Sequence, residues 1–192
     1  CLLGFFIVSL LLLASCNNKI PDGAIKDFVQ NFDYDKSFET TKKRYDNLKR
    51  IWKDKEIVIV EGEFSRLGLN NDLFDDAKSI ERIICPASNA YNKYDEILSA
   101  IKKQSKKKMY ILSLGPTATI LADDLSKDGY HARDLGHIDI EYMWFNNRST
   151  KKETVYGKFV NEVTDNGEIA DIVDDNYKNQ IIAVIKWFRS GD

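Results

Sequence analysis

Apolar residues recur with two different periods along the chain, and these periods predict helices and strands in turn. The first apolar stripe recurs at spacings of seven, three and four residues and predicts a helix that ends near residue 52: Phe38, Tyr45, Leu48 and Trp52. The run from Ile57 to Val60 follows, rich in β-branched residues and without polar alternation. Such a run is typical of a strand that is covered on both faces of a sheet.

The same patterns predict three more strands, with helices between them. These strands are expected at residues 82–85, 109–114 and 130–135. Ser88 or Asn89 is a candidate cap for a helix after the first of them. Gly115 and Pro116 predict the start of another helix, because proline is favoured at the first helical position, and Gly129 predicts its end.

Apolar spacing within these helices also predicts the faces that they bury. The inward residues of the first are expected to be Tyr91, Tyr94, Leu98 and Ile101. Those of the second are expected to be Ile120, Leu121 and Leu125. A polar loop at 146–153 precedes a last amphipathic helix with the inward residues Tyr177, Ile181, Val184, Ile185 and Phe188.

Strands that alternate with helices over this length predict the α/β class, with a mostly parallel sheet flanked by helices and right-handed crossovers. The length of 192 residues makes one globular domain the default. Ligands of open parallel sheets bind at the carboxyl ends of the strands. The residues that follow Val60, Cys85, Leu114 and Leu135 are therefore the ones where a binding site is expected.

Two of these strand ends carry groups suited to phosphate. After Val60, Arg66 supplies a planar cation for a pyrophosphate and Ser65 a small donor, although an ordinary polar loop has the same composition. After Leu114, a helix that begins near Thr117 offers free backbone amides and the positive end of its dipole. A structural helix that is simply well capped is the alternative there.

The segment after Leu135 carries candidate metal ligands. If residues 136–142 are extended, His137, Asp139 and Glu141 project from one face. Two carboxylates about 7 Å apart along a strand can lean toward one hard divalent cation. An exposed strand with solvated acids is the competing interpretation, and His137 could be a ligand, a base or a structural residue.

Composition narrows the classes of partner and site. A formal net charge of −2 gives no electrostatic case for binding nucleic acid. The three cysteines show no CxxC spacing, so neither a disulfide framework nor a zinc site is indicated. Cys85 ends an apolar run and is expected to be a buried thiol.

The sequence indicates an apolar leader at residues 1–20 and a linker at residues 21–36. The apolar run from Leu2 to Ala14 has the length of the core of an export signal. It ends in Leu-Ala-Ser-Cys, which matches a bacterial lipobox and would lipidate Cys16. Membrane association through this segment is expected; a lipidated Cys16 and an accidental leader on a shortened gene are competing interpretations.

Four longer runs together resemble the GT-D glycosyltransferases, formerly a bacterial domain of unknown function: IVEGEFSRLGLNNDLF (59–74), IICPASNAYNKYDEIL (83–98), LGPTATILADDL (114–125) and LGHIDIEYMWF (135–145). FVNE at 159–162 and residues 177–182 also resemble the end of that family. The resemblance covers residues 37–188 and implies a Rossmann-like domain. It implies transfer of a sugar, typically glucose, from a UDP-sugar to a glycan or glycoprotein acceptor in bacterial surface-polymer synthesis.

The resemblance also implies a site. Its D-x-E acids would hold a divalent metal, Mn²⁺ or Mg²⁺, at Asp139 and Glu141. The nucleotide would be bound by Ser65, Arg66, Asn71, Asp72, Gly115, Pro116 and Thr117. The cation, Arg66 and the helix start at Thr117 would offset charge on the UDP leaving group. The candidate bases for the acceptor hydroxyl are Glu61, Glu63 and His137, and the sequence does not choose among them.

The chain also departs from the family pattern. Asn70 stands where the family usually has glycine, a tolerable change because asparagine enters left-handed conformations readily. A Phe-Gly-Asp-Gly-Glu-like motif of the family's N-terminal portion has no counterpart, so the chain is expected to carry the C-terminal part only. The alternative function is a non-catalytic nucleotide-binding remnant that is tethered to the membrane through Cys16. A dinucleotide oxidoreductase is disfavoured because the glycine fingerprint is missing.

Overall fold

The computed structural model describes residues 34–187, so the predicted leader, the lipobox and most of the linker lie outside the described residues. One five-stranded sheet has the order β4-β3-β1-β2-β5, and every pair of neighbours is parallel. Its strands are β1 (Glu56–Gly62), β2 (Ser79–Cys85), β3 (Met109–Ser113), β4 (His131–Asp134) and β5 (Ile181–Val184). The predicted α/β fold with a parallel sheet is confirmed.

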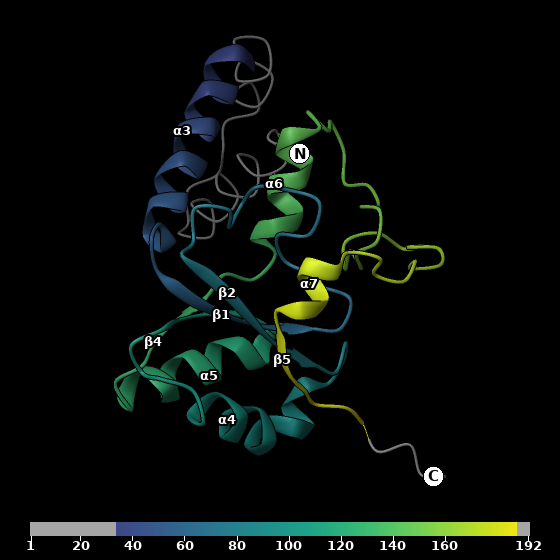
Figure 1. Cartoon of the computed structure of the whole chain (residues 1–192). Helices are drawn as coiled ribbons and strands as arrows, with labels where there is room; N and C mark the ends of the chain where they lie inside the picture. The colour runs from purple at the N-terminus through teal and green to yellow at the C-terminus, as the bar shows by residue number, and fades with distance from the viewer. Residues whose placement is uncertain (1–33, 188–192) are drawn as a thin grey trace, which may run out of the picture.

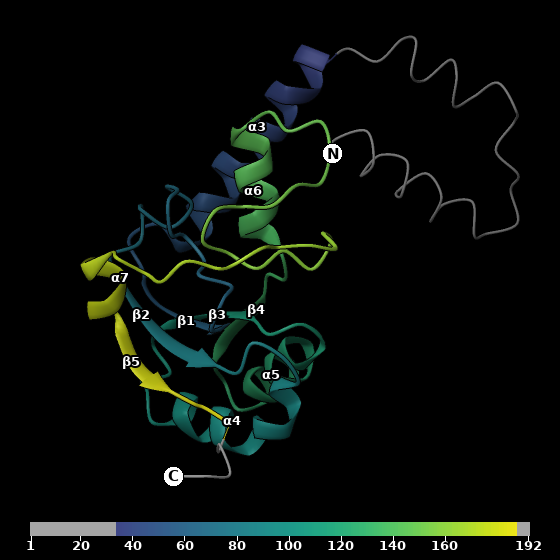
Figure 2. The same cartoon turned by 90° about the vertical axis from the view of Figure 1, so that its right-hand side faces the viewer.

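Helices cover both faces of this sheet (Figure 1, Figure 2). They are α3 (Tyr34–Trp52), the 3₁₀ turn η1 (Ala90–Lys93), α4 (Tyr94–Lys102), α5 (Pro116–Lys127), α6 (Ile138–Asn146) and α7 (Asp175–Asn179). Helices α4 and α5 pack below the sheet in Figure 1, and α3 and α6 lie above it. Helix α7 leads directly into the edge strand β5.

Strand β1 is central and buried from both sides, as its apolar run predicts. Val58 and Val60 pack with the helices α4 and α5, whereas Ile57 and Ile59 pack with α3 and α6. All four side chains have exposed fractions of 0%. The alternation of a strand therefore divides one apolar run between two cores.

Residues 136–142 do not form the extended segment that would place three polar groups on one face. Gly136, with φ of +50°, turns the chain after β4, and α6 begins at Ile138. Ile138, Tyr142 and Phe145 then follow helical spacing into the core beneath α3. A short apolar run fits both periods, and here burial of this stripe decides in favour of the helix.

The predicted C-terminal amphipathic helix is also wrong. Helix α7 ends at Asn179, and Ile181–Val184 pairs in parallel with β2 as strand β5. Three of the four residues of this strand are β-branched, and they gain ladder hydrogen bonds at an open sheet edge, which the spacing of apolar residues cannot reveal. Ile182 and Val184 stay 41% and 50% exposed, so the outer edge of the sheet is partly apolar.

Smaller details of the helices also differ from expectation. Tyr91 is 59% exposed and Ile120 44% exposed, so neither belongs to an inward face. Asn89 occupies the cap position of η1, but its side chain forms no capping hydrogen bond. The start of α5 at Pro116 and the left-handed Gly129 after its end agree with the prediction.

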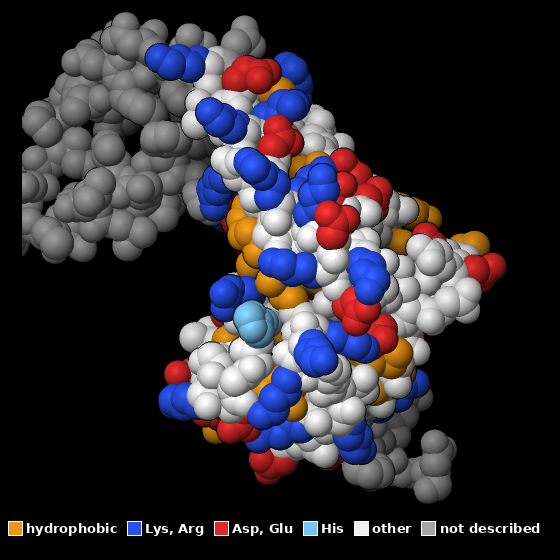
Figure 3. Space-filling view, turned by 60° about the vertical axis from the view of Figure 1, so that its left-hand side comes forward, with side chains coloured by type: hydrophobic (Ala, Val, Ile, Leu, Met, Phe, Trp, Pro, Cys, Tyr) orange, Lys and Arg blue, Asp and Glu red, His pale blue; other side chains and the backbone are white. Residues whose placement is uncertain are grey.

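The outer surface of α3 carries mixed charges. Figure 3 shows basic and acidic side chains interleaved over this helix, without one extended area of a single sign on the face in view. Within residues 34–187, no helix is both long enough and apolar enough to cross a lipid bilayer.

Candidate active site

A pocket of about 270 Å³ lies at the carboxyl edge of the sheet. Its lining comes from five parts of the chain: Gly62, Phe64, Ser65 and Leu67 at and after the end of β1, residues 86–90 after β2, residues 113–116 from the end of β3 to the start of α5, Gly136, His137, Asp139 and Ile140 around the start of α6, and Phe159 and Asn161. This is the edge where parallel sheets bind their ligands. A pocket thus exists where the strand ends predicted a site, and binding of a ligand there stays a prediction.

The pocket brings together five of the predicted site residues, namely Ser65, Gly115, Pro116, His137 and Asp139. The remaining ones do not line it: Glu61, Glu63, Arg66, Asn71, Asp72, Thr117 and Glu141. Several of these have well-defined structural partners instead.

The start of α5 forms one side of the pocket. Gly115 precedes the helix with φ of +55° and ψ of −143°. Residues other than glycine rarely adopt this backbone conformation. Pro116 at the first helical position has a suitable φ and no N–H to satisfy. The first-turn amides and the positive end of the helix dipole thus face a space that can hold an anion.

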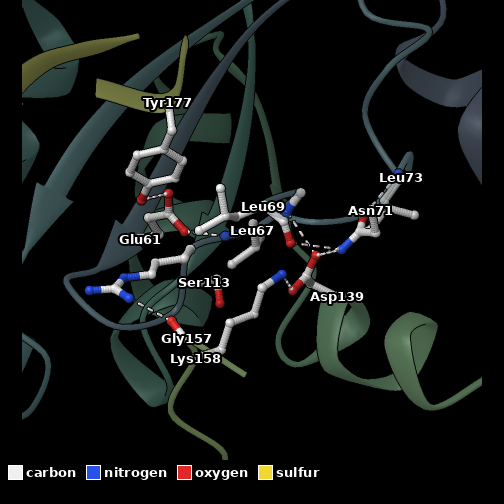
Figure 4. Close-up of polar contacts among 12 residues, drawn as sticks. Glu61, Leu67, Leu69, Asn71, Leu73, Ser113, Asp139, Gly157, Lys158 and Tyr177 are labelled. Carbon is white, nitrogen blue, oxygen red and sulfur yellow. Dashed lines mark hydrogen bonds and ion pairs between the residues drawn. The ribbon is translucent and has the colours of Figure 1, made fainter. Parts of the chain in front are cut away.

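Glu61 is a structural carboxylate, contrary to its prediction as a base. Its side chain is 0% exposed. It accepts hydrogen bonds from Leu67 N at 2.6 Å and the Tyr177 hydroxyl at 2.9 Å (Figure 4). It also accepts one from Arg82 Nη1 at 2.6 Å. A buried carboxylate with three donors has no open path to an acceptor hydroxyl, so Glu61 fits no proton-transfer role in this arrangement.

Replacing Tyr177 by phenylalanine is expected to lower the free energy of unfolding by about 1.5–3 kcal/mol, because a buried hydrogen bond to a charged acceptor is lost. Tyr177 is 3% exposed. Urea denaturation measures this loss. Tyr156→Phe is the matched control, since Tyr156 is 81% exposed. A loss of no more than that of the control would show that the hydroxyl contributes nothing to stability.

Arg66 also differs from its prediction as a pyrophosphate ligand. It is 5% exposed, and its Nη1 donates to the carbonyl oxygens of Gly157 and Ala170, both at 2.7 Å. The guanidinium thereby attaches the segment after α6 to the loop after β1. Its role in the structure is to position that segment, and it does not contact the pocket.

The other predicted nucleotide contacts in this loop are likewise engaged. Asp72 forms an ion pair with Lys49 at 2.6 Å and accepts from the Tyr142 hydroxyl at 2.7 Å. Asn71 Nδ2 donates to Asp139 Oδ1 at 2.8 Å. Thr117 is 5% exposed, on the inner side of α5.

Two buried acids hold the backbone of the loop after β1. Leu67 N donates to Glu61, and Gly68 N donates to Asp139 Oδ1 at 2.7 Å. Gly68 and Asn70 lie in the left-handed region, with φ of +76° and +61°. Asparagine at position 70 is therefore compatible with the left-handed conformation that glycine would adopt there.

Lys158 completes the environment of Asp139. Its Nζ lies 2.5 Å from Asp139 Oδ2, and the two side chains are 0% and 2% exposed (Figure 4). Burial lowers the pKa of the Lys158 ammonium, and the Asp139 carboxylate opposes that shift. Both carboxylate oxygens of Asp139 thus already have protein partners.

Asp139 and Glu141 do not share a face, and the predicted two-carboxylate clamp is not formed. On α6 they are two positions apart, or about 200° around the axis. Burial raises the pKa of the half-buried Glu141 carboxyl. Among the described residues, no group of three or more His, Cys, Asp or Glu side chains could hold a metal ion.

His137 is the one candidate base that lines the pocket. It occupies the cap position of α6, is exposed, and its Nε2 lies 3.3 Å from Asn161 Nδ2. Glu63 is also exposed, but it does not line the pocket. Of the three candidates, only His137 combines access to solvent with a place in the cavity.

Comparison with known proteins assigns this arrangement to a family. A family model described as "Glycosyltransferase GT-D fold" matches residues 26–163. The chain belongs to the GT-D glycosyltransferase family. This GT-D chain is 44% identical over 136 residues to "Probable glycosyl transferase Gly" of Streptococcus gordonii, covering 71% of this chain and 20% of that protein. It is 40% identical over 144 residues to "Glycosyltransferase GlyD" of Streptococcus pneumoniae serotype 4, covering 75% and 18%.

Solved structures support the same assignment. "The highly conserved domain of unknown function 1792 has a distinct glycosyltransferase fold" describes a structure 40% identical to the GT-D chain, with a TM-score of 0.72. It covers 77% of this chain and 53% of that one. "A New Glycosyltransferase (DUF1792) from Streptococcus sanguinis" has 41% identity and a TM-score of 0.71, with coverage of 76% and 55%. The chain spans about half of these structures and about a fifth of the curated relatives.

Several residues of the GT-D site have no role in the sequence prediction. They are Phe64, the 86–90 loop, Lys158, Phe159 and Asn161. The 86–90 loop could be found from the sequence, because a site was expected directly after Cys85. Residues 159–162 belong to the FVNE resemblance, which gave them no role in the site. Nothing in the sequence indicates the role of Lys158, because its distance along the chain from Asp139 does not reveal that the two side chains pair.

Proposed function

We propose that this chain transfers a sugar, with glucose as the first candidate, from a UDP-sugar to a hydroxyl of a glycan or glycoprotein acceptor. The acceptor would belong to the synthesis of bacterial surface glycoproteins or polysaccharides. The observation that carries the proposal is the pocket at the carboxyl edge, where the start of α5, Ser65 and His137 meet. Membership of the GT-D family makes glycosyl transfer the chemistry to test there.

The chain's own groups support a displacement at the anomeric carbon. The first turn of α5 would bind the diphosphate and stabilise the negative charge that grows on it as its bond to the sugar breaks. The Ser65 hydroxyl lines the same pocket and would donate a further hydrogen bond. In a direct displacement, His137 would accept the proton of the acceptor hydroxyl as its oxygen bonds to the sugar.

The proposal includes a divalent cation, Mn²⁺ or Mg²⁺. Bound to the diphosphate, it would offset the charge of the leaving group. Glu141 fits this role only in part, because it is partly exposed but does not line the pocket. Asp139 does not fit, since Lys158, Gly68 and Asn71 already occupy its oxygens. One carboxylate together with phosphate oxygens is a frequent arrangement for Mg²⁺.

Two measurements test the function. Isothermal titration with UDP, with and without Mn²⁺, reports binding, and release of UDP from UDP-glucose with and without an acceptor glycan reports turnover. Metal-dependent binding together with release supports the transferase. Binding without release supports the alternative, a non-catalytic nucleotide-binding remnant. No binding and no release contradict the proposed site.

Glu141→Gln is expected to weaken metal-dependent binding of UDP on the order of tenfold or more, because a charged ligand of the cation is lost. The melting temperature should remain that of the wild type. Asp139→Asn is expected to act differently and lower thermal stability, because it disturbs the Lys158 ion pair. Glu168→Gln, at an exposed position, is the control. Unchanged metal-dependent affinity in Glu141→Gln contradicts the assignment.

Localisation is a separate proposal. We expect association with the membrane through residues 1–20, with the catalytic domain on the cytoplasmic side, where sugar nucleotides are made. Lipidation of Cys16 is the competing arrangement. Mass spectrometry of the N-terminal region in the native host separates them, since one outcome shows an intact leader and the other a lipid on Cys16.

A further inference from the structure

A second cavity, of about 250 Å³, lies between the loop after β1 and helix α7. The loop lines it with Gly68, Asn70 and Asn71, and the opposite wall carries Asn176 and Gln180. No residue lines both this cavity and the pocket at the carboxyl edge. Pockets for drug-sized ligands measure about 300–1,000 Å³, so this cavity suits a ligand of about the size of one sugar ring.

Arg82 places a buried cation in the wall of the second cavity. Its side chain is 3% exposed, and it donates from Nη1 to Glu61 and from Nε to Gln180 Oε1, at 2.6 and 2.7 Å. Its Nη2 donates no hydrogen bond to any residue between 34 and 187. This nitrogen is not sealed off, since Arg66 Nε is the one enclosed side-chain nitrogen or oxygen without a partner in that range. Nη2 is therefore a donor that a ligand in the cavity can use.

Three exposed side chains around the cavity also lack protein partners. Asn70, Asp75 and Asn176 line it, and their side chains form no hydrogen bond within the described part of the chain. Gln180 accepts from Arg82 through Oε1, which leaves its two N–H groups for other partners. Amides donate and accept, and a carboxylate accepts, so the set offers both kinds of group. A sugar hydroxyl also donates and accepts, so it can pair with each of them.

The charges around the second cavity disfavour an ionic ligand. The exposed carboxylates of Asp75 and Asp174 oppose an anion, and the Arg82 guanidinium opposes a cation. Arg82 and Glu61 form an ion pair with exposed fractions of 3% and 0%, so a charge of the protein already balances the guanidinium. The ligand that fits these groups is uncharged and carries several hydroxyls.

The walls of the two cavities are in direct contact. Gly68 N and Asn71 Nδ2, from residues that line the second cavity, both donate to Asp139 Oδ1 at 2.7 and 2.8 Å. Asp139 lines the pocket at the carboxyl edge. A ligand in the second cavity therefore lies beside the site proposed for transfer, and the loop after β1 contributes to both.

We propose that the second cavity binds a neutral sugar unit of the acceptor glycan, away from the hydroxyl that reacts. Arg82 Nη2 donates to a sugar oxygen, and the Asp75 carboxylate accepts from a hydroxyl. The amides of Asn70 and Asn176 pair with neighbouring hydroxyls. The role of this sugar as part of the acceptor rests on the proposed function. Such a site selects acceptors that contain at least two sugar units.

The test titrates maltose, lactose and N,N′-diacetylchitobiose into the wild type, Asp75→Ala and Asn176→Ala, with binding followed by NMR. At least one of these neutral disaccharides should bind the wild type. Asp75→Ala should weaken that binding by about tenfold or more, because a hydrogen bond to a charged group is lost, and Asn176→Ala by about threefold or more. UDP should bind both variants as it binds the wild type, since neither residue lines the pocket at the carboxyl edge.

Two neighbouring substitutions and one charged sugar serve as controls. Asp76→Ala and Asn179→Ala change exposed residues that line neither cavity, so both should bind the disaccharide as the wild type does. Glucuronic acid should bind the wild type more weakly than glucose, because Asp75 and Asp174 oppose its carboxylate.

Three results overturn this assignment while leaving the proposed function intact. One is a wild-type protein that binds UDP but none of the neutral disaccharides. Another is a disaccharide affinity in Asp75→Ala and Asn176→Ala equal to that of the controls. The third is tighter binding of glucuronic acid than of glucose, which would indicate an anion site at Arg82. A wild-type protein that binds a disaccharide but neither binds UDP nor releases it from UDP-glucose overturns the proposed function, and the bound sugar is then no acceptor.

Discussion

Lys158→Met is expected to lower the free energy of unfolding by about 3–5 kcal/mol, the largest loss of stability among the variants considered. Lys158 and Asp139 form an ion pair with exposed fractions of 0% and 2%. Removing the ammonium leaves a buried carboxylate without its charged partner, and the methionine supplies only apolar contacts. Urea denaturation measures the loss.

A double variant distinguishes the unpaired charge from lost packing. Lys158→Met combined with Asp139→Asn removes both charges, while the amide oxygen can still accept from Gly68 N. Stability should therefore recover in part relative to Lys158→Met alone. Lys152→Met, at an exposed position of the preceding segment, is the control. A Lys158→Met protein as stable as this control would show that the ion pair contributes nothing.

His137→Asn is expected to reduce turnover by about 10²- to 10⁴-fold, the loss typical for removal of a general base. His137 lines the pocket at the start of α6. Asparagine is chosen because it is a favoured residue at helix caps, so the helix should be retained. The affinity for UDP should change little, since the imidazole acts on the acceptor hydroxyl. Release of UDP from UDP-glucose, measured beside a UDP titration, separates the two effects.

The second histidine of the chain supplies the matched control. His131 lies at the start of β4 and is exposed, outside the pocket lining. His131→Asn should keep wild-type turnover. If His137→Asn also keeps it, His137 is not the base, and the proton must be accepted elsewhere. Equal losses in both variants would indicate a general effect on the fold.

Much of the scaffold follows from local pattern. The apolar run in β1 predicts a strand buried on both faces, and Gly115 with Pro116 predicts the helix start that lines the pocket. Cys85 is a buried thiol as expected, and burial raises its pKa. These features depend on neighbours in sequence, because β-branched runs, caps and first-turn prolines act within a few residues.

Local pattern is insufficient where two periods fit the same short run. The segment after Leu135 fits a strand and a helix, and only the space beneath α3 selects α6 by burying Ile138 and Tyr142. Ile181–Val184 likewise becomes β5 because β2 offers a free edge. In both cases a partner far away in the sequence supplies the deciding contacts.

By itself the sequence indicated the order of strands and helices from β1 to β4, the edge of the sheet where the pocket lies, and the family. Only the tertiary structure decided what each polar residue does at that edge. Glu61 meets Tyr177 from 116 residues away, and Arg66 meets Ala170 from 104 residues away. Spacing along the chain carries no information about such partners. A carboxylate near a strand end can act as a base only if it reaches the cavity. It is a structural acceptor if donors from distant parts of the sequence fold around it and bury it.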